Sequence, residues 1–339
     1  MIRCDLRLYE VRSLSEMGKI RDAWNHLALS APTTTSFQTW EWNFGMAKHE
    51  GNSVRLRIVV AKDKFGEVVG IAPFWIRSNG IPGLSVLEFI GRGDYSDLFF
   101  SEPYKDIFVS SVMEWIECNT EWRIIHLHNV RQEIVDLISR YDGRLTTRPC
   151  GVCPYAQLPD TFEDYEQKVL QKRLRQKIRQ KRKQLAGNGL LTFSVCETTS
   201  QLQADLPVFF DLHQRRQRTK GERGRFFEEK WRTSFEEISL ALLRAGFLTL
   251  GLLRIDGQPA ASLYNVRFQD QELSLLWRNV GSIGPVQSWK HARPFDDRDG
   301  NQRRGAGVRF LERGRALQVL VDQRQSAVVR DGAGPVQGG

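Results

Sequence analysis

Two stretches of the chain share one pattern of apolar and polar positions. Leu56–Ile76 and Leu248–Phe268 each contain an apolar run, a short segment with Asp and Gly, and a second apolar run. Asp and Gly between two hydrophobic runs are the strongest short-range signal for a β-hairpin, because Gly adopts the positive φ that tight turns need. Since the two copies lie far apart, they predict two related domains rather than a short-period array.

Around the first hairpin, helix-like and strand-like patterns alternate. Apolar residues at helical spacing predict helices, and short apolar runs predict strands. The helices are expected at 15–30, 37–49, 105–119 and 131–141, and the strands on either side of Gly91–Asp94, at 122–130 and at 143–149. This alternation is typical of a mixed sheet flanked by helices.

A Pro-rich stretch at 149–160 is predicted to be a loop that joins two domains. Thr161 and Asp164 then form a capping signal for one long helix, expected to run from 161 to 187 and to end at a Gly-rich segment. A strand, two helices, the second hairpin and a last strand follow. The predicted organisation is an α+β fold with domains at 1–150 and 151–280 and a tail at 281–339.

The composition is that of a folded chain. The protein has 339 residues, of which 41% are hydrophobic and 10% aromatic, enough for two cores. Its apolar runs are strand-length and broken by charges, so no membrane span is expected. The N-terminus lacks the apolar region of a signal peptide, and we therefore expect a cytoplasmic protein.

The cysteines and histidines do not predict a metal site. The five cysteines are odd in number and irregularly spaced, so they do not indicate a disulfide framework. Cys150 and Cys153 form a CxxC motif, but a structural zinc site needs two further ligands. His126 and His128 alternate on a predicted strand and lack the spacing of a helical ligand pair. We expect reduced thiols and no bound metal.

The helix expected at 161–187 concentrates much of the positive charge of a chain whose formal charge is +9. Like charges one helical turn apart are destabilising, which suggests a partner. Three interpretations stay open: a solvated face, a site for an anionic small substrate, and a nucleic-acid surface. On the first, the core-facing stripe comprises Val169, Leu170, Leu174, Ile178 and Leu185.

Two groups of residues are candidates for chemistry. In the second half, His213 is the best candidate for acid–base work, because imidazole titrates near neutral pH. Its neighbours Asp211 and Arg215 are i,i+4 partners, and Arg223 and Arg225 are candidates to bind an anion. The alternative is a helix end whose charges are solvent-exposed.

In the first half, Gly93–Asp97 places two carboxylates and a phenol at a strand junction, where loop-borne chemistry is common. Asp94 is a candidate catalytic residue, and Tyr95 and Asp97 are candidates for substrate binding. The alternative is an Asp-rich turn.

Several segments in order resemble one family. They are SFQTWEW, GIAPFW, Asp-Tyr-Ser-Asp-Leu-Phe, KRLRQKIRQKRKQL, FFDLHQRR and DGQPAASLYNVRF. Over residues 30–277 this set is similar to the GNAT-superfamily acetyltransferases of the cellulose-biosynthesis type, which are relatives of the FemAB-like peptidoglycan aminoacyltransferases. The resemblance implies two tandem GNAT-like domains. It also implies acyl transfer from a donor such as acetyl-CoA to an amine, on a small molecule or on a saccharide or cell-envelope precursor.

The resemblance leaves the individual roles as hypotheses. We predict His213 and Asp94 as catalytic residues and Arg216, Arg225, Tyr95 and Asp97 as substrate-binding residues. Acetyl-CoA or another acyl-CoA is expected as a co-substrate, with no permanently bound cofactor and no assigned cofactor-binding residues. The alternatives are aminoacyl-tRNA-dependent transfer, as in the FemAB-like relatives, and nucleic-acid binding through the basic helix 161–187.

The family pattern stops after Trp277. The motif Gln302–Gly307 matches the GNAT pyrophosphate pattern, but it follows no predicted strand. Codons for residues 305–323 permit a family-like peptide in a displaced frame, so we predict a frameshifted, disordered tail and an incomplete second domain. If that is so, we expect the polypeptide to be inactive; the gene sequence tests the hypothesis.

Overall fold

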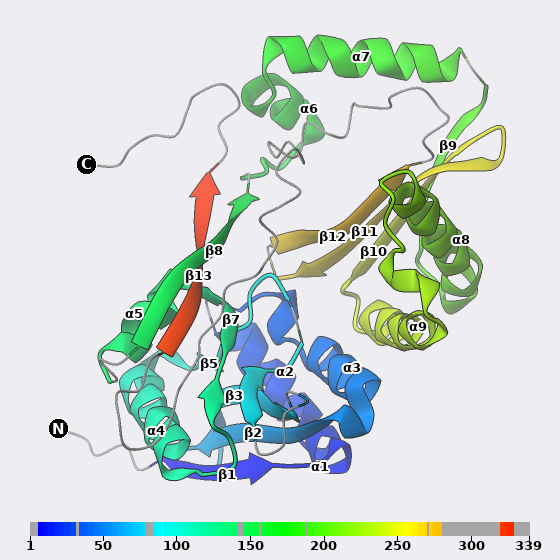
Figure 1. The fold of residues 1–339 in the computed structure, drawn as a ribbon. Helices are drawn as coiled ribbons and strands as arrows, with labels where there is room; N and C mark the ends of the chain where they lie inside the picture. Colours follow the sequence, from blue (N-terminus) through cyan, green and yellow to red (C-terminus); the bar gives the residue numbers. More distant parts are fainter. Residues whose placement is uncertain are drawn as a thin grey trace.

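The computed structural model describes residues 6–279, apart from 32–33, 79, 81–83, 92, 142–144, 156, 188 and 270, and residues 319–328. Within this part of the chain, the strands form three sheets that helices flank (Figure 1). The protein therefore has the predicted α+β fold.

The first half is built on a sheet with the strand order β1-β2-β3-β4-β6, to which β5 adds by pairing with β3. The strands are β1 (Arg7–Val11), β2 (Val54–Lys62), β3 (Val68–Ser78), β4 (Ser85–Phe89), β5 (Phe99–Phe100) and β6 (Ile124–Ile125). The accompanying helices are α1 (Leu14–Lys19), α2 (Arg21–Ser30), α3 (Trp40–Glu50), α4 (Lys105–Cys118) and α5 (Gln132–Ser139).

The second half is built on a sheet with the strand order β12-β11-β10-β9. The strands are β9 (Leu191–Val195), β10 (Leu248–Ile255), β11 (Gln258–Phe268) and β12 (Gln271–Asn279), and the helices are α8 (Thr199–Arg218) and α9 (Glu229–Arg244). The predicted order of strand, two helices and three strands is confirmed.

The two halves repeat one topology. In each, a first strand leads through helices into a hairpin, and a fourth strand pairs with the second arm of that hairpin. The hairpins are β2–β3 and β10–β11, which confirms the two predicted from sequence. The second has a two-residue turn in which Asp256 and Gly257 have φ of 49° and 76°, as such turns require.

Two hydrophobic cores stabilise the molecule. One contains Trp24, Phe37 and Ile58 from the first half together with Phe209 and Tyr264 from the second. The other includes only residues from the first half, between its sheet and the helices α4 and α5. Because the first core crosses the boundary between the halves, they pack as one unit.

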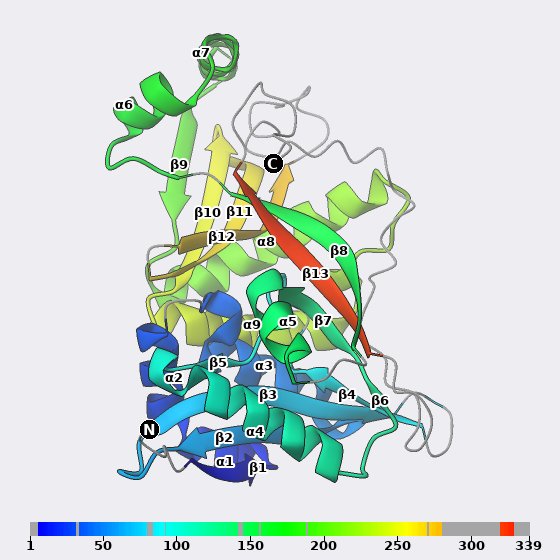
Figure 2. The ribbon, with the colours of Figure 1, turned by 90° about the vertical axis from the view of Figure 1, so that its left-hand side faces the viewer.

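A third sheet includes the residues around the predicted domain boundary. It has the order β7-β13-β8, from β7 (Leu127–Arg131), β13 (Val319–Val328) and β8 (Leu145–Tyr155), and β13 runs parallel to both neighbours (Figure 2). The prediction of a loop from 149 is wrong as far as Tyr155, because β13 supplies a pairing partner for the backbone there. The boundary at 150 falls within β8.

The same sheet corrects part of the prediction for the tail. Residues 319–328, expected to be disordered, form β13 because the edges of β7 and β8 offer them backbone hydrogen bonds. The remaining tail residues, including Gln302–Gly307, lie outside the described residues.

Two helices, rather than the predicted single one, lie between residues 161 and 187. The Thr161 hydroxyl caps α6 (Phe162–Asp164) as expected, and a π-turn at Tyr165–Val169 follows. The chain becomes extended at Leu170, and α7 (Lys172–Ala186) begins after it. Leu170, at the break, is buried.

None of the described helices combines the length and apolar character needed to cross a membrane.

Candidate functional site

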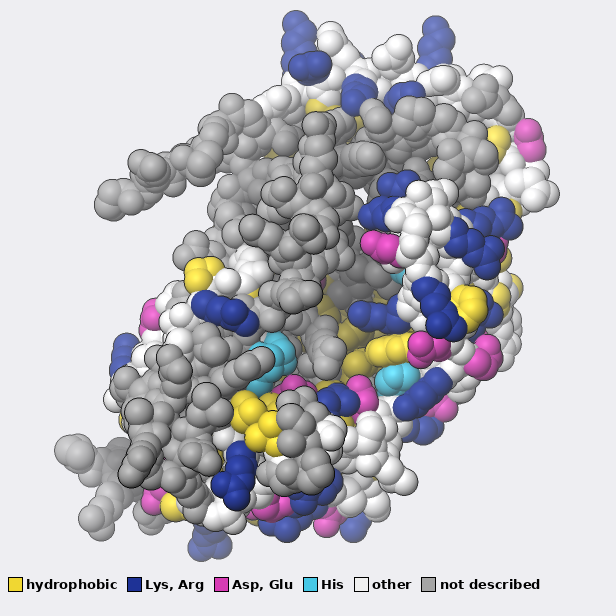
Figure 3. Space-filling model, viewed as in Figure 1, with side chains coloured by type: hydrophobic (Ala, Val, Ile, Leu, Met, Phe, Trp, Pro, Cys, Tyr) yellow, Lys and Arg dark blue, Asp and Glu magenta, His cyan; other side chains and the backbone are white. Residues whose placement is uncertain are grey.

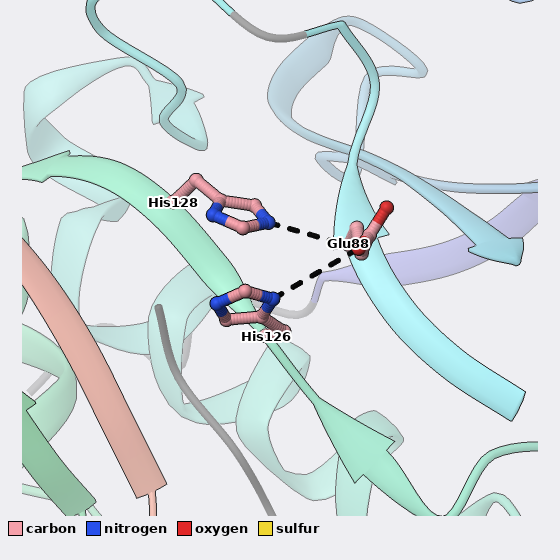
Figure 4. A group of neighbouring side chains, drawn as sticks. All are labelled: Glu88, His126 and His128. Carbon is pink, nitrogen blue, oxygen red and sulfur yellow. Dashed lines mark ion pairs between the residues drawn. The ribbon is translucent and has the colours of Figure 1, made fainter. Parts of the chain in front are cut away.

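Glu88, His126 and His128 gather where the first and third sheets meet (Figure 4). β4 and β6 are parallel with Leu87 opposite Ile125, so Glu88 in β4 and His126, which directly follows β6, come next on the two sides. Side chains alternate along an extended chain, which brings His128 to the same face as His126. Local alternation and strand register together therefore assemble this cluster.

The two oxygens of Glu88 have different neighbours. Oε1 lies 3.6 Å from Nε2 of His128 and 3.9 Å from Nδ1 of His126. Oε2 accepts hydrogen bonds from Nε1 of Trp75 at 3.2 Å and from Nε of Arg77 at 3.3 Å. The carboxylate is thus held by one oxygen and presents the other to the two imidazoles.

Glu88 is ionised over the ordinary pH range. Its burial alone raises the pKa of the carboxyl, but the nearby His128, the Trp75 indole and the Arg77 guanidinium outweigh that cost and lower the pKa to about 2. The cluster therefore combines a buried negative charge with two imidazoles.

The loop that carries the predicted first-half residues is bound to β7, next to this cluster. Asn129, which follows His128, donates a side-chain hydrogen bond to the Gly93 carbonyl at 2.6 Å. Its own carbonyl accepts a hydrogen bond from the backbone N–H of Ser96 at 3.2 Å. The structure thus places the segment 93–97 beside the histidine strand.

The three predicted residues in this loop have different surroundings. Asp94 is exposed, whereas Tyr95 is buried and its carbonyl accepts a hydrogen bond from the Gln38 amide. Asp97 is fully buried and accepts hydrogen bonds from the backbone N–H and side-chain Nε of Arg131. Burial raises the pKa of Asp97 against the opposing effect of Arg131. In this structure Asp97 anchors the loop to β7.

His213 lies inside an aromatic cluster of the second half. Its side chain is 2% exposed, and its ring centroid lies 4.8 Å from that of Phe226 and 6.3 Å from that of Phe209. The sequence predicts His213 as a titratable group close to a helix end, and the structure places His213 on the core-facing side of α8. Its role as a base stays a prediction.

The arginines of the second half lie nearer the surface. Arg216 is half-buried and Arg225 is exposed, with its guanidinium 5.0 Å from the Trp231 ring centroid. Asp211 and Arg215 form the predicted i,i+4 ion pair at 2.7 Å. The Arg216 and Arg225 roles in substrate binding are not tested by these contacts.

A polar hollow of about 400 Å³ lies between α8, α9 and the segment that joins them. Its lining comprises Pro207, Phe210, Asp211, Gln214, Arg218, Phe227, Glu229, Arg232 and Glu236. The charged members include acids and arginines, so the hollow suits a polar or zwitterionic molecule better than a purely anionic one. Of the described second-half candidates, His213, Arg216 and Arg225 are not among its lining residues.

The basic helix α7 stands apart from the sheets in both ribbon views (Figures 1 and 2). Leu185 is buried, but Leu174 and Ile178 are half-buried and Val169 is exposed, so the predicted core-facing stripe is only partly covered. Lys and Arg side chains project from this part of the molecule and from the region of α8 and α9 (Figure 3). Arg179 pairs with Glu166 at 3.4 Å.

Sequence reasoning missed the contribution of Glu88. The spacing of His126 and His128 does not indicate a helical ligand pair. The i,i+2 spacing does, however, place two imidazoles on one face of a strand. The carboxylate comes from a strand that is distant in sequence, and only the pairing of β4 with β6 brings it there.

The comparisons with known proteins concern both halves. Residues 172–277 match the acetyltransferase (GNAT) domain family. The match covers less than half of the chain and includes α7, the second hairpin and most of β12. It supports a GNAT acyltransferase domain in the second half. No curated protein matches the chain.

Among solved structures, a conserved protein of unknown function from Bacteroides thetaiotaomicron VPI-5482 is similar, with a TM-score of 0.51, 10% identity and 84% of each chain covered. At this identity the likeness concerns the fold alone. FemX has a TM-score of 0.46 and 16% identity over 74% of this chain, which spans 58% of the FemX chain. A tandem GNAT protein from the clavulanic acid biosynthesis pathway has a TM-score of 0.36 and 11% identity, with 81% of this chain and 79% of that one covered.

Proposed function

We propose that the protein is an N-acyltransferase that moves an acyl group from a thioester donor to an amine. The observation that carries the proposal is the GNAT-domain match over residues 172–277. The repeated topology of β1–β4 and β9–β12 supports it, because it extends the same arrangement to the first half.

The donor is acetyl-CoA or another acyl-CoA, which acts as a co-substrate and leaves after each turnover. The family resemblance suggests an acceptor amine on a small molecule, a saccharide or a cell-envelope precursor, with a role in polysaccharide biosynthesis. The position expected for the CoA pyrophosphate follows β12 and lies outside the described residues.

The reaction requires two contributions from the protein, a general base and an oxyanion-stabilising N–H. The neutral amine attacks the thioester carbonyl, a general base accepts the proton that the amine loses, and a backbone N–H stabilises the oxyanion before the CoA thiolate leaves. His213 is the proposed base and Asp94 a second catalytic group, with Arg216, Arg225, Tyr95 and Asp97 as proposed contacts of the acceptor. Because Phe226 and Phe209 surround His213, its participation requires substrate to reach the α8 side of this cluster.

The test is release of CoA thiol from acetyl-CoA in the presence of a panel of polyamines, amino sugars and amino acids. Acceptor-dependent release is expected for the chain with its frame restored after Trp277. His213→Gln should lower kcat by about 100- to 10,000-fold if the imidazole is the base, whereas His26→Ala, at an exposed position of α2, should leave it unchanged. Absence of acceptor-dependent release across acyl-CoA donors would count against the proposal.

A second candidate is aminoacyl-tRNA-dependent transfer, and the exposure of the basic helix α7 favours it. Phosphate neutralisation by Lys and Arg makes nucleic-acid binding steeply dependent on salt. We expect this candidate to show activity with charged tRNA and none with acetyl-CoA. Simple nucleic-acid binding predicts the same salt dependence without transfer. If α7 binds tRNA, with or without transfer, replacing Lys172, Arg173, Lys177 and Arg182 with Gln should abolish tRNA binding. If α7 is only a solvated helix, the same replacements should leave tRNA binding unchanged.

A further inference from the structure

We propose that Glu88, His126 and His128 form a binding site for one divalent transition-metal ion of the zinc class. The ligands are Oε1 of Glu88, Nδ1 of His126 and Nε2 of His128, which all lie within 4.8 Å of one another. This site is in the first half and does not depend on the proposed acyltransferase function.

The donor set selects the class of ion. Two imidazole nitrogens and one carboxylate oxygen are preferred by Zn²⁺ and neighbouring first-row ions, whereas Ca²⁺ and Mg²⁺ prefer oxygen ligands throughout. The cysteines and the spacing of the histidines alone predict no metal site; the carboxylate of Glu88 completes the ligand set.

The distances are close to those that a bound ion needs. Ligands about 2.1 Å from a tetrahedral Zn²⁺ lie about 3.4 Å from one another. The measured separations from Oε1 are 3.6 Å and 3.9 Å. The two imidazole nitrogens lie within 4.8 Å of each other, so the three ligands must move somewhat closer together around an ion.

The surroundings orient the carboxylate as an outer shell does in metal sites. Trp75 and Arg77 both donate to Oε2, which leaves Oε1 directed at the imidazoles. Arg77 forms ion pairs with both Glu88 and Glu50, the latter with Oε2 at 3.0 Å from Nη1. The charge of Arg77 is therefore shared between two carboxylates, and Oε1 of Glu88 stays directed at the imidazoles.

Nε2 of His128 gives an independent indication. This buried atom has no hydrogen-bond partner among the residues that the structure describes. Buried polar atoms are nearly always paired with protein, water or an ion, and a metal ion shared with Glu88 would satisfy it.

The position of the site suggests what the ion does. Glu88 comes from the first sheet, and His128 comes from β7 in the third sheet. A bound ion would join the two sheets, so it should stabilise the first half against unfolding.

The experiment measures Zn²⁺ binding to the full chain after removal of metal by a chelator, with isothermal titration and elemental analysis. We expect one ion per chain and a higher Tm with Zn²⁺. His128→Ala and Glu88→Gln should each weaken binding by more than about 100-fold, because changes to outer-shell residues alone cost about 10- to 100-fold. The control His26→Ala alters an exposed histidine and should bind as the wild type does.

Two measurements keep the proposal open to refutation. If His128→Ala does not fold, as shown by circular dichroism, His128→Gln takes its place. Co²⁺ replaces Zn²⁺ to report the ligands: a spectrum without sulfur-to-cobalt charge transfer supports the site, and a thiolate band would assign the ion to cysteines instead. Absence of stoichiometric binding, or wild-type affinity in both the His128 and Glu88 variants, would overturn the proposal.

Discussion

The strand sets β1–β4 and β9–β12 share the same strand order and the same kind of connections. Their fourth strands differ. β4 is buried from Val86 to Phe89, and β6 pairs with its outer edge at Val86 and Leu87. In β12, residues 271–274 are exposed or half-buried, and β11 is its partner within the described chain. The same strand topology therefore does not produce the same site in both halves. The Glu88 cluster exists because β6 continues the first sheet.

The two cores extend the comparison. The core beneath α4 and α5 belongs to the first half alone, whereas the other joins both halves through α3 and α9. The second half thus shares its main core with the first. The predictions below test how far the halves depend on each other.

The largest effect is expected from Phe209→Ala. Phe209 is fully buried, and its ring centroid lies 5.4 Å from that of Tyr264 and 5.7 Å from that of Phe226. Loss of the ring should cost about 3–5 kcal/mol and, because this core is shared, shift one cooperative denaturant transition. Phe65→Ala, at a side chain that is 77% exposed, should change stability by less than about 0.5 kcal/mol. Two separate transitions, with the midpoint for the first half unchanged, would mean that the halves unfold independently.

The next effect concerns the contact between α3 and α9. A Cβ at Gly45 would lie 2.2 Å from Cγ1 of the buried Ile238, so Gly45→Ala should cost about 1–3 kcal/mol through overpacking. The matched control is Gly18→Ala in α1, where a Cβ meets nothing within 4 Å. That change should stabilise the protein by about 0.5–1 kcal/mol through helix propensity. Equal denaturation midpoints for the two variants would contradict the close packing of α3 on α9.

The hairpin turns compare the two copies directly. Gly66 and Gly257 have φ of 87° and 76°, so alanine at either position should cost about 1–2 kcal/mol because its Cβ disfavours this conformation. Chemical denaturation of Gly66→Ala and Gly257→Ala measures both. A loss in one variant and none in the other would show that the two turns are not equivalent.

The smallest effect is a pH dependence at the contact between the halves. Nδ1 of His49 lies 2.7 Å from the Ser234 hydroxyl, and its ring centroid lies 3.9 Å from that of Trp231, with the rings tilted by 33°. Burial first, and then the charge of Lys230, lower the pKa of His49; the other charges that act on it are those of Glu50, Arg225 and Glu228.

Since the folded-state pKa of His49 lies below the unfolded value of 6.5, its contribution to stability is complete above that pH and is lost as the pH falls through the folded-state value. Thermal unfolding between about pH 7 and pH 5 should show a steeper loss for the wild type than for His49→Gln. Parallel curves of Tm against pH for the wild type and His49→Gln would show that His49 does not cause the loss of stability.

The sequence predicted the parts of the fold that local signals determine. The turns at Gly66 and Gly257 and the Thr161 cap depend on neighbouring residues, and the structure has them where they were expected. The helix break at Leu170 and the continuation of β8 beyond Pro149 were not predicted. The continuation of β8 depends on pairing with the distant β13, which no local signal encodes.

The same distinction explains the candidate site. His126 and His128 share a strand face, which their spacing alone permits one to predict. Glu88 joins them through the pairing of β4 with β6, which no local signal encodes. The enclosure of His213 by aromatic rings likewise depends on Phe226, which follows the end of α8 and packs back on it.

The central claim, acyl transfer by a GNAT-type second half, is tested most directly by a titration with acetyl-CoA that is followed by thermal unfolding. If the gene carries the predicted displaced frame, the chain with its frame restored after Trp277 should show a saturable rise in Tm; otherwise the chain as it stands should show it. The reason is that a ligand that binds only the folded state stabilises it. No change in Tm at saturating acetyl-CoA, together with a rise caused by charged tRNA, would contradict the claim.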